Sequence, residues 1–168
     1  AAAAAYALEI SNEQIATGLI TATLGTKWRM EIEELGGLKI INDYYNANPE
    51  STKAAIKTLV LLSQESGGAS WAVLGKMNEL GEAEKSGHLE VLKYCQEIGV
   101  DHLVTVGTDL YKSDESENSE KHLLVHNCAN ADTVLELVSN FSAGDVILLK
   151  ASRSEKFEDL ANLLRSKW

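Results

Sequence analysis

The chain has 168 residues, enough for one well-packed core, and its 45% hydrophobic and 24% charged residues are typical of a globular domain. The net charge of −10 disfavours a nucleic-acid surface, because phosphate backbones are bound by patches of lysine and arginine. No run reaches the roughly 18 apolar residues of a membrane span, so we expect no transmembrane helix.

Residues 1–25 are predicted to form two short helices. The first covers Ala1–Ile10 and starts within an alanine run that has neither an N-cap nor a preceding methionine, so we expect a piece of a longer protein. Ser11 and Gln14 have the spacing of a capping box, which places the start of the second helix at Asn12. We therefore assign residues 1–25 to the end of one domain and residues 26–168 to a second domain.

The second domain is predicted to alternate strands with helices. Its first strand, Trp28–Leu35, has Met30 and Ile32 on one face, and the turn Gly36-Gly37 joins it to strand Leu38–Asn42. The later predicted elements are helix Glu50–Gln64, strand Ser70–Leu74, helix Leu89–Ile98, strand Asp101–Val106, strand His122–His126, helix Ala131–Phe141, strand Asp145–Leu149 and helix Glu155–Lys167. This order predicts an α/β fold with a mainly parallel, Rossmann-like sheet flanked by helices. The first strand is either an antiparallel edge of that sheet or part of a linker.

Clusters of polar residues follow the predicted strands. They occupy residues 43–51, 75–79, 107–109, 127–130 and 150–153. In a parallel sheet these loops meet at one edge, which is where open α/β sheets bind ligands. Asn48 is a good N-cap and Pro49 suits the first helical position, but capping does not explain Asp43, Tyr45 or Asn46. These three residues therefore indicate a ligand.

Three segments resemble motifs of the Mur ligase family. Asp43–Ser51 is similar to its DxYNANPxS motif, Leu74–Gly81 to its LGxMxELG loop, and Leu148–Arg153 to its LxKGSR segment, with Ala151 in place of glycine. His88 also falls where the family has a histidine. Three motifs in the right order over most of the chain identify it as a member of this family. Among its members, the chain most resembles the enzymes that add D-alanyl-D-alanine to a UDP-muramoyl-tripeptide.

The resemblance implies a Mur ligase C-terminal domain, with residues 1–25 as the end of the central ATPase domain. It implies an ATP-dependent ligase of peptidoglycan precursor synthesis in the bacterial cytoplasm, and so a part in cell shape and division. The tripeptide carboxylate would be phosphorylated by ATP, and the amine of D-alanyl-D-alanine would then attack the acyl phosphate. Mg²⁺ would be bound mainly by the central domain. The chain lacks a GxxGK[ST] loop, so we expect it to fold alone but not to ligate.

The resemblance also implies a set of site residues. Arg29 would be the catalytic residue that reaches the ATP phosphates, which suits its bidentate and permanently charged guanidinium. The residues expected to bind ATP are Arg29, Asp43, Asn46 and Asn48, with Asp43 on the ribose. The residues expected to bind the dipeptide are Tyr45, His88, Lys150, Ser152 and Arg153. No residue of the chain is assigned to a metal.

Plainer interpretations of the same residues stay open. Arg29 could be an exposed strand arginine, Asp43 a turn residue and Asn48 only a helix cap. His88 equally suits a structural role, and residues 150–153 could be the capped start of a helix with solvated cations.

Other functions compete with this interpretation. Another Mur ligase or a folylpolyglutamate synthase shares the fold, although these families tend to have a histidine where Asn46 stands. A free-standing α/β nucleotide-binding module without catalysis is the alternative from a different class. Cys95 and Cys128 lack metal-type spacing and are expected to be reduced core residues, which fits a cytoplasmic protein.

Overall fold

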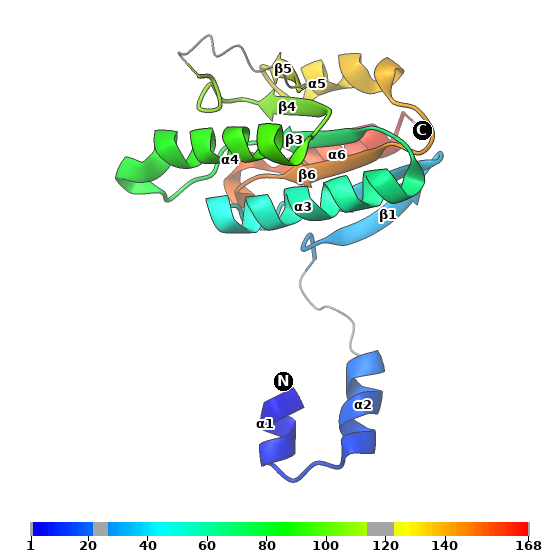
Figure 1. Cartoon of the computed structure of the whole chain (residues 1–168). Coiled ribbons are helices and arrows are strands. Elements are labelled where there is room, and N and C mark those ends of the chain that lie inside the picture. The colour runs from blue at the N-terminus through cyan, green and yellow to red at the C-terminus, as the bar shows by residue number, and fades with distance from the viewer. Residues whose placement is uncertain (1, 22–26, 114–122, 168) are drawn as a thin grey trace.

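The computed structural model describes residues 2–21, 27–113 and 123–167 (Figure 1). The strands are β1 (Glu31–Leu35), β2 (Leu38–Asn42), β3 (Ser70–Leu74), β4 (His102–Val106), β5 (Leu124–Cys128) and β6 (Val146–Lys150). The α-helices are α1 (Ala2–Ala7), α2 (Asn12–Thr21), α3 (Pro49–Ser66), α4 (Glu84–Ile98), α5 (Ala131–Val134) and α6 (Phe157–Arg165). Short 3-10 helices are η1 (Gly81–Ala83), η2 (Leu135–Asn140) and η3 (Arg153–Glu155).

The strands form one sheet in the order β1-β2-β6-β3-β4-β5. Strands β2, β6, β3, β4 and β5 run parallel, and β1 forms an antiparallel hairpin with β2. The predicted α/β class is confirmed, and the first strand is an antiparallel edge rather than a linker. Because the five parallel strands point the same way, the loops that follow them lie at one edge of the sheet.

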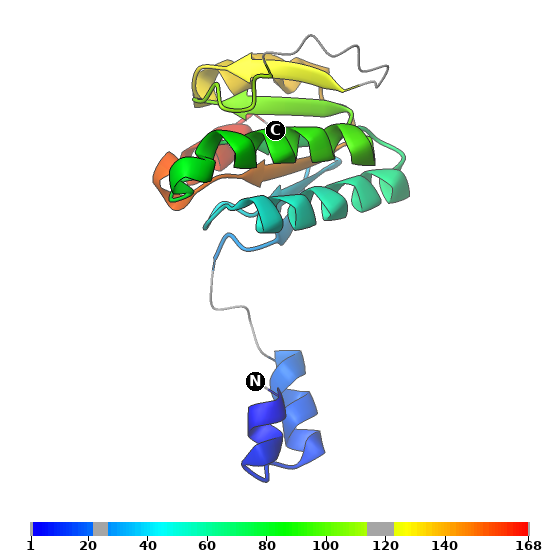
Figure 2. The same cartoon turned by 60° about the vertical axis from the view of Figure 1, so that its left-hand side comes forward.

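Helices cover both faces of the sheet. Helices α3 and α4 lie on one face, whereas α5, η2 and α6 lie on the other (Figures 1 and 2). Leu148 of β6 packs with Ile56 and Leu59 of α3, and the neighbouring Ile147 belongs to the core that includes Leu160 of α6. Every residue of β6 is buried, as expected for a parallel strand that is covered on both sides.

Strand β1 differs from its prediction in extent and in the face it buries. It begins at Glu31 rather than Trp28, because Trp28 and Met30 adopt left-handed conformations, with φ of 62° and 51°, that interrupt an extended chain. Ile32 is 52% exposed, whereas the Glu33 carboxylate pairs with Arg165 of α6 at 2.9 Å. The strand therefore turns its charged face toward α6.

The predicted caps are confirmed. Asn48 accepts a hydrogen bond from the Ser51 N–H in a capping box at the start of α3. Helix α2 begins at Asn12, and the Ser11 hydroxyl accepts from the Gln14 N–H at 3.3 Å. These features depend on residues that are close in sequence, which is why the pattern alone predicts them.

Other boundaries are shifted. Helix α4 begins before the predicted Leu89, and α6 begins after the predicted Glu155, because Lys156 adopts a left-handed conformation (φ 53°). The predicted helix 131–141 is α5 followed by the tighter η2. The strand predicted at residues 122–126 is observed two residues later, as β5. The first residue of the predicted strand, His122, lies outside the described residues.

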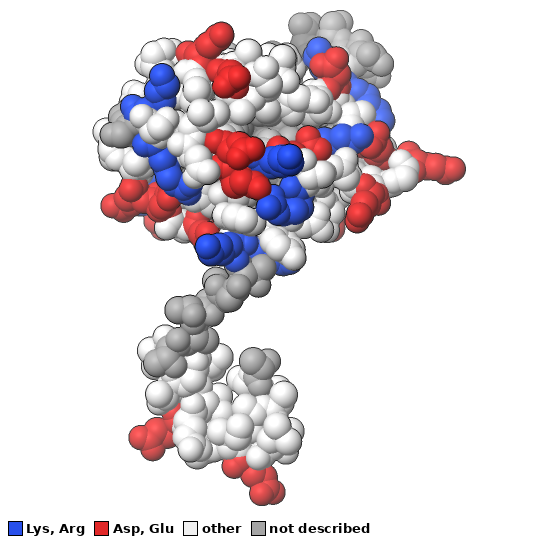
Figure 3. All heavy atoms as spheres, turned by 180° about the vertical axis from the view of Figure 1, so that it is seen from behind, with Lys and Arg blue, Asp and Glu red and all other residues white. Residues whose placement is uncertain are grey.

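Helices α1 and α2 contact each other and stand apart from the sheet (Figures 1 and 2). The predicted domain boundary between residues 25 and 26 falls in the segment 22–26, outside the described residues, and stays a prediction. Across the described ranges, no helix combines the length and hydropathy that a membrane crossing requires. On the face of the α/β domain that Figure 3 shows, acidic and basic side chains are interspersed.

Candidate functional site

A cavity of about 400 Å³ opens at the carboxyl edge of the sheet, beside the ends of β2 and β6 and the start of α3. Its lining residues are Arg29, Met30, Asp43, Asn46, Asn48, Ser51, Ala54, Ala55, Thr58 and Lys150. All four residues that are predicted to bind ATP are among them. The sequence analysis did not predict the part of the lining that α3 supplies. These residues have the spacing i, i+3, i+4 and i+7 from Ser51, which places them on one face of the helix and could have indicated them.

Asp43 follows β2 and is held on both carboxylate oxygens. Oδ1 accepts a hydrogen bond from the Met30 N–H at 3.2 Å, and Oδ2 lies 2.7 Å from Nζ of Lys150. The Asp43 N–H donates to the Leu149 carbonyl at 3.0 Å, so the ladder between β2 and β6 continues into the loop. A carboxylate has about four acceptor positions, so Asp43 keeps capacity for the hydroxyl groups of a ligand.

Arg29 reaches the cavity from the segment before β1. It lies between the left-handed residues Trp28 and Met30, and its Cζ is 4.4 Å from the centroid of the Tyr45 ring. The Tyr45 N–H donates to the Trp28 carbonyl at 3.1 Å, which ties this segment to the loop after β2. A cation–π contact uses the face of the guanidinium and none of its five N–H donors. Arg29 can therefore still bind an anion bidentately.

The two asparagines of the loop also support its backbone. The Asn46 side-chain oxygen accepts from the Ala47 N–H at 2.8 Å, and its main-chain carbonyl accepts from Lys150 at 2.9 Å. The cap interpretation of Asn48 is correct, because its side chain accepts from the third residue of α3. A contact between either asparagine and a nucleotide stays a prediction.

The residues expected to bind the dipeptide differ in their exposure, and their contact with it stays a prediction. Tyr45 is 40% exposed, and Arg153 is half-exposed beside the Trp28 ring, 4.6 Å from Cζ to centroid. Arg153 also forms a bidentate pair with Glu158, with both oxygens 2.7 Å from Nη1. Lys150, Ser152 and His88 are buried, at 2%, 5% and 0% exposure. The last three residues hold loops together rather than facing solvent.

Ser152 joins the two loops that follow β3 and β6. Its hydroxyl accepts from the Asn78 N–H at 2.8 Å, and its own N–H donates to the Lys76 carbonyl at 3.0 Å. The Asn78 amide donates to the Ser154 hydroxyl at 2.7 Å. Close packing accompanies these bonds, because a Cβ on Gly75 would lie only 2.8 Å from the Ala151 methyl. Ala151, which stands where the family motif has glycine, therefore packs directly against Gly75 of the loop after β3.

His88 lies inside α4 and positions the loop after β3. Nε2 accepts from the Met77 N–H at 2.9 Å, so the ring proton is on Nδ1 and donates to the Glu84 carbonyl at 2.6 Å. The ring also packs edge-on against Tyr111, whose hydroxyl donates to the Gly75 carbonyl at 3.0 Å. Burial lowers the pKa of His88 below its ordinary value. With a buried ring and both nitrogens engaged, His88 supports the loop after β3, and its contact with the dipeptide stays a prediction.

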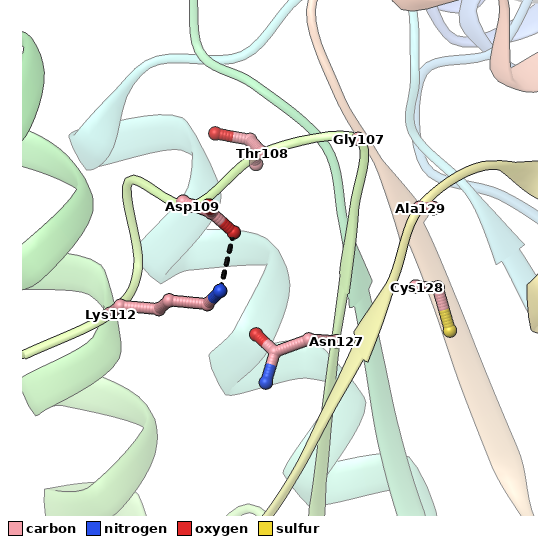
Figure 4. Close-up of a pocket in the computed structure, with 7 residues that line it drawn as sticks. All are labelled: Gly107, Thr108, Asp109, Lys112, Asn127, Cys128 and Ala129. Carbon is pink, nitrogen blue, oxygen red and sulfur yellow. Dashed lines mark ion pairs between the residues drawn. The ribbon is translucent and has the colours of Figure 1, made fainter.

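A second cavity of about 390 Å³ lies at the same edge, beyond β4 and β5 (Figure 4). The Asp109 carboxylate pairs with Lys112 at 2.7 Å, and Asn127 extends toward the same side of the strands. Cys128 points away from this pair in Figure 4, and burial raises the pKa of its thiol. This cavity corresponds to the polar clusters that follow these strands in the sequence.

Within the described ranges, no group of three histidine, cysteine, aspartate or glutamate side chains could hold a metal ion. The first cavity offers one carboxylate, Asp43, and Lys150 already neutralises it. Cys95 lies in the core, where burial raises the pKa of its thiol to about 12.

Comparisons with known proteins agree on one family. Residues 28–153 match the family model described as "Mur ligase, glutamate ligase domain". The chain is 37% identical over 162 residues to the UDP-N-acetylmuramoyl-tripeptide–D-alanyl-D-alanine ligase of Bacillus subtilis, which covers 95% of this chain and 35% of that protein. The chain therefore spans about a third of the length of the curated relatives it matches.

Solved structures show the same fold. A crystal structure of MurF from Acinetobacter baumannii superposes with a TM-score of 0.77 at 27% identity, covering 96% of this chain and 35% of the other. The MurF ligase of Thermotoga maritima in complex with ADP superposes with a TM-score of 0.71 at 24% identity, covering 87% and 32%.

Proposed function

The chain belongs to the Mur ligase family, and we propose on this basis that it is the C-terminal domain of a ligase that joins D-alanyl-D-alanine to UDP-N-acetylmuramoyl-tripeptide. The name of the relatives that it matches over almost its whole length supports this substrate pair. The loop with Asn46 in place of the histidine of related families supports the same branch.

The observation that carries the proposal is the cavity at the ends of β2 and β6. It gathers Arg29, Asp43, Asn46 and Asn48, which lie up to 19 positions apart in the numbering, around the N-terminal turn of α3. A guanidinium and a helix N-terminus favour phosphate groups, and a carboxylate with free acceptor positions favours ribose hydroxyls. The Thermotoga relative that was solved with ADP is consistent with a nucleotide at this site.

In this proposal each residue has a defined task. Asp43 accepts hydrogen bonds from the ribose, and Arg29 donates to the phosphates, where it offsets the negative charge that moves during phosphoryl transfer. The tripeptide carboxylate oxygen bonds to the γ-phosphorus as ADP leaves. The dipeptide amine then attacks the acyl carbon, the amine loses a proton, and inorganic phosphate leaves with the bonding electrons. Closure of the domain would exclude water, which would otherwise hydrolyse the acyl phosphate.

For the dipeptide, the exposed candidates are Tyr45 and Arg153. Ser152 would act by holding its loop in place, because it is 5% exposed and its hydroxyl accepts from the Asn78 N–H. Mg²⁺ would accompany ATP with ligands mainly in the central domain, as the family resemblance implies. No step above depends on the metal.

The proposed setting is the bacterial cytoplasm, where ATP and the soluble nucleotide-linked precursor are available. The reaction would supply peptidoglycan synthesis and, through it, cell shape and division.

The test is ADP release by the full-length ligase that carries this chain. Turnover should require ATP, UDP-N-acetylmuramoyl-tripeptide and D-alanyl-D-alanine together, and the product mass should equal the two joined substrates minus water. D-Glutamate in place of the dipeptide is the matched control and should give no turnover. Equal turnover with D-glutamate would contradict the proposed substrate. Turnover by the isolated chain would contradict its proposed dependence on the central domain.

A further inference from the structure

Lys150 is a buried charge in the wall of the first cavity. Its side chain is 1% exposed, although lysine is almost never fully buried unless it is paired. It ends β6, which lies between β2 and β3, so its side chain is placed next to the loop that follows β2. The family resemblance implies that Lys150 binds the dipeptide, whose carboxylate would be the natural partner of a lysine.

The hydrogen bonds of Lys150 leave no donor for such a carboxylate. Nζ donates to Oδ2 of Asp43 at 2.7 Å, to the Asn46 carbonyl at 2.9 Å and to the Asp43 carbonyl at 3.3 Å. A lysine ammonium has three N–H donors. Each therefore has an acceptor within the protein, and all three acceptors belong to the loop after β2.

These bonds fix the residues that surround the proposed nucleotide. Lys150 holds one oxygen of Asp43 while the Met30 N–H holds the other, so the carboxylate has a single orientation. Met30 directly follows Arg29, so the same clamp also places the catalytic arginine. The bond to the Asn46 carbonyl holds the turn that leads to the cap of α3.

We propose that Lys150 is a positioning residue for the nucleotide, acting through Asp43 and Asn46, and that the dipeptide carboxylate is not its ligand. This inference rests on the proposed function. Loss of Lys150 would leave the Asp43 carboxylate free to rotate away from the ribose and would release the segment that carries Arg29. The main-chain carbonyl of Lys150 also accepts from the Gly75 N–H at 2.9 Å, so the residue joins this loop to the loop after β3.

The experiment compares Lys150→Met with the unchanged full-length ligase. Methionine is unbranched like lysine and one atom shorter, and it removes the charge and the donors. We expect the KM for ATP and the Kd for ADP to rise about tenfold to a hundredfold, the range for loss of hydrogen bonds to charged groups, with the KM for D-alanyl-D-alanine unchanged. Lys93→Met is the matched control, because Lys93 is 76% exposed on α4, and it should change none of these values.

The opposite pattern would overturn the inference. A raised KM for the dipeptide with an unchanged KM for ATP would make Lys150 a dipeptide ligand, and equal changes in both would make its role only structural. If the unchanged ligase gives no turnover, the proposed function fails. The role of Lys150 can still be tested then by measuring the Kd for ADP by calorimetry. In that case equal Kd values for both proteins, or no ADP binding by either, would reject it.

A second variant covers the case in which Lys150→Met does not fold. Asp43→Asn combined with Lys150→Met removes both charges, so no unpaired charge stays buried. Because Lys150 also holds the Asn46 carbonyl, the double variant should bind ADP at least as weakly as Asp43→Asn alone and keep the dipeptide KM of that variant. A further rise in dipeptide KM on adding Lys150→Met would contradict the positioning role.

Discussion

Replacement of His88 by leucine tests whether this residue binds substrate or supports the fold. In the structure the ring accepts from the Met77 N–H at 2.9 Å and packs edge-on against Tyr111. Leucine would leave a buried donor unsatisfied, which costs about 1–3 kcal/mol, and would lose an aromatic pair worth about 0.5–1.5 kcal/mol. We expect the free energy of unfolding to fall by about 2–4 kcal/mol on these grounds. Urea denaturation followed by circular dichroism measures this change.

The pH dependence of stability gives an independent readout. Burial lowers the pKa of His88 in the folded chain, so below the ordinary value of about 6.5 the unfolded chain binds more protons than the folded chain. The stability that the neutral, buried His88 contributes is therefore complete above pH 6.5, and it is lost as the pH falls toward the pKa of the folded chain. His102 and His126 are shifted in the same direction and add to this slope. His88→Gln keeps an acceptor but does not titrate, so it should flatten the slope by up to about 1.4 kcal/mol per pH unit.

The two variants together can refute the structural role. His88→Gln should lose less stability than His88→Leu, because the glutamine oxygen can still accept from Met77. If His88→Leu unfolds at the same urea concentration as the unchanged chain and raises the KM for the dipeptide, His88 is a substrate residue and the reasoning is wrong.

Three further changes have defined outcomes. Gly75→Ala should destabilise the chain by about 1–3 kcal/mol in urea denaturation, because the new Cβ would lie 2.8 Å from the Phe157 ring. Asn48→Ala should cost about 1 kcal/mol in the same assay, because it removes the cap of α3; unchanged stability would mean that the cap is replaced by solvent. Asp145→Ala should lower the free energy of unfolding by more than about 2 kcal/mol in this assay, because the carboxylate accepts from Trp71 Nε1 and from two main-chain N–H groups. A smaller loss would show that water replaces the carboxylate.

The sequence predicts those parts of the molecule that depend on neighbouring residues. The alternation of strands and helices, the cap at Asn48 and the meeting of polar loops at one edge all follow from short-range patterns. The cavity residues Asp43 and Asn46 were found through a motif that is continuous in sequence, and Arg29 through the position at which the family carries an arginine.

The parts that the sequence does not predict depend on contacts between distant residues. Lys150 and Asp43 are separated by 107 positions, and no periodicity shows that one neutralises the other. The face that β1 buries depends on the pairing of Glu33 with Arg165, 132 positions away. His88 was assigned from a family position, and only the fold shows that both of its nitrogens are used.

The placement of β6 has a consequence for how the domain is made. On the ribosome, β2 and β3 are synthesised before β6, the strand that lies between them in the sheet. Until then these strands lack a shared neighbour, and Asp43 lacks the cation that orients it. The nucleotide loop should therefore reach its working shape only after translation has passed residue 150, and nascent chains stopped before β6 should not bind ADP.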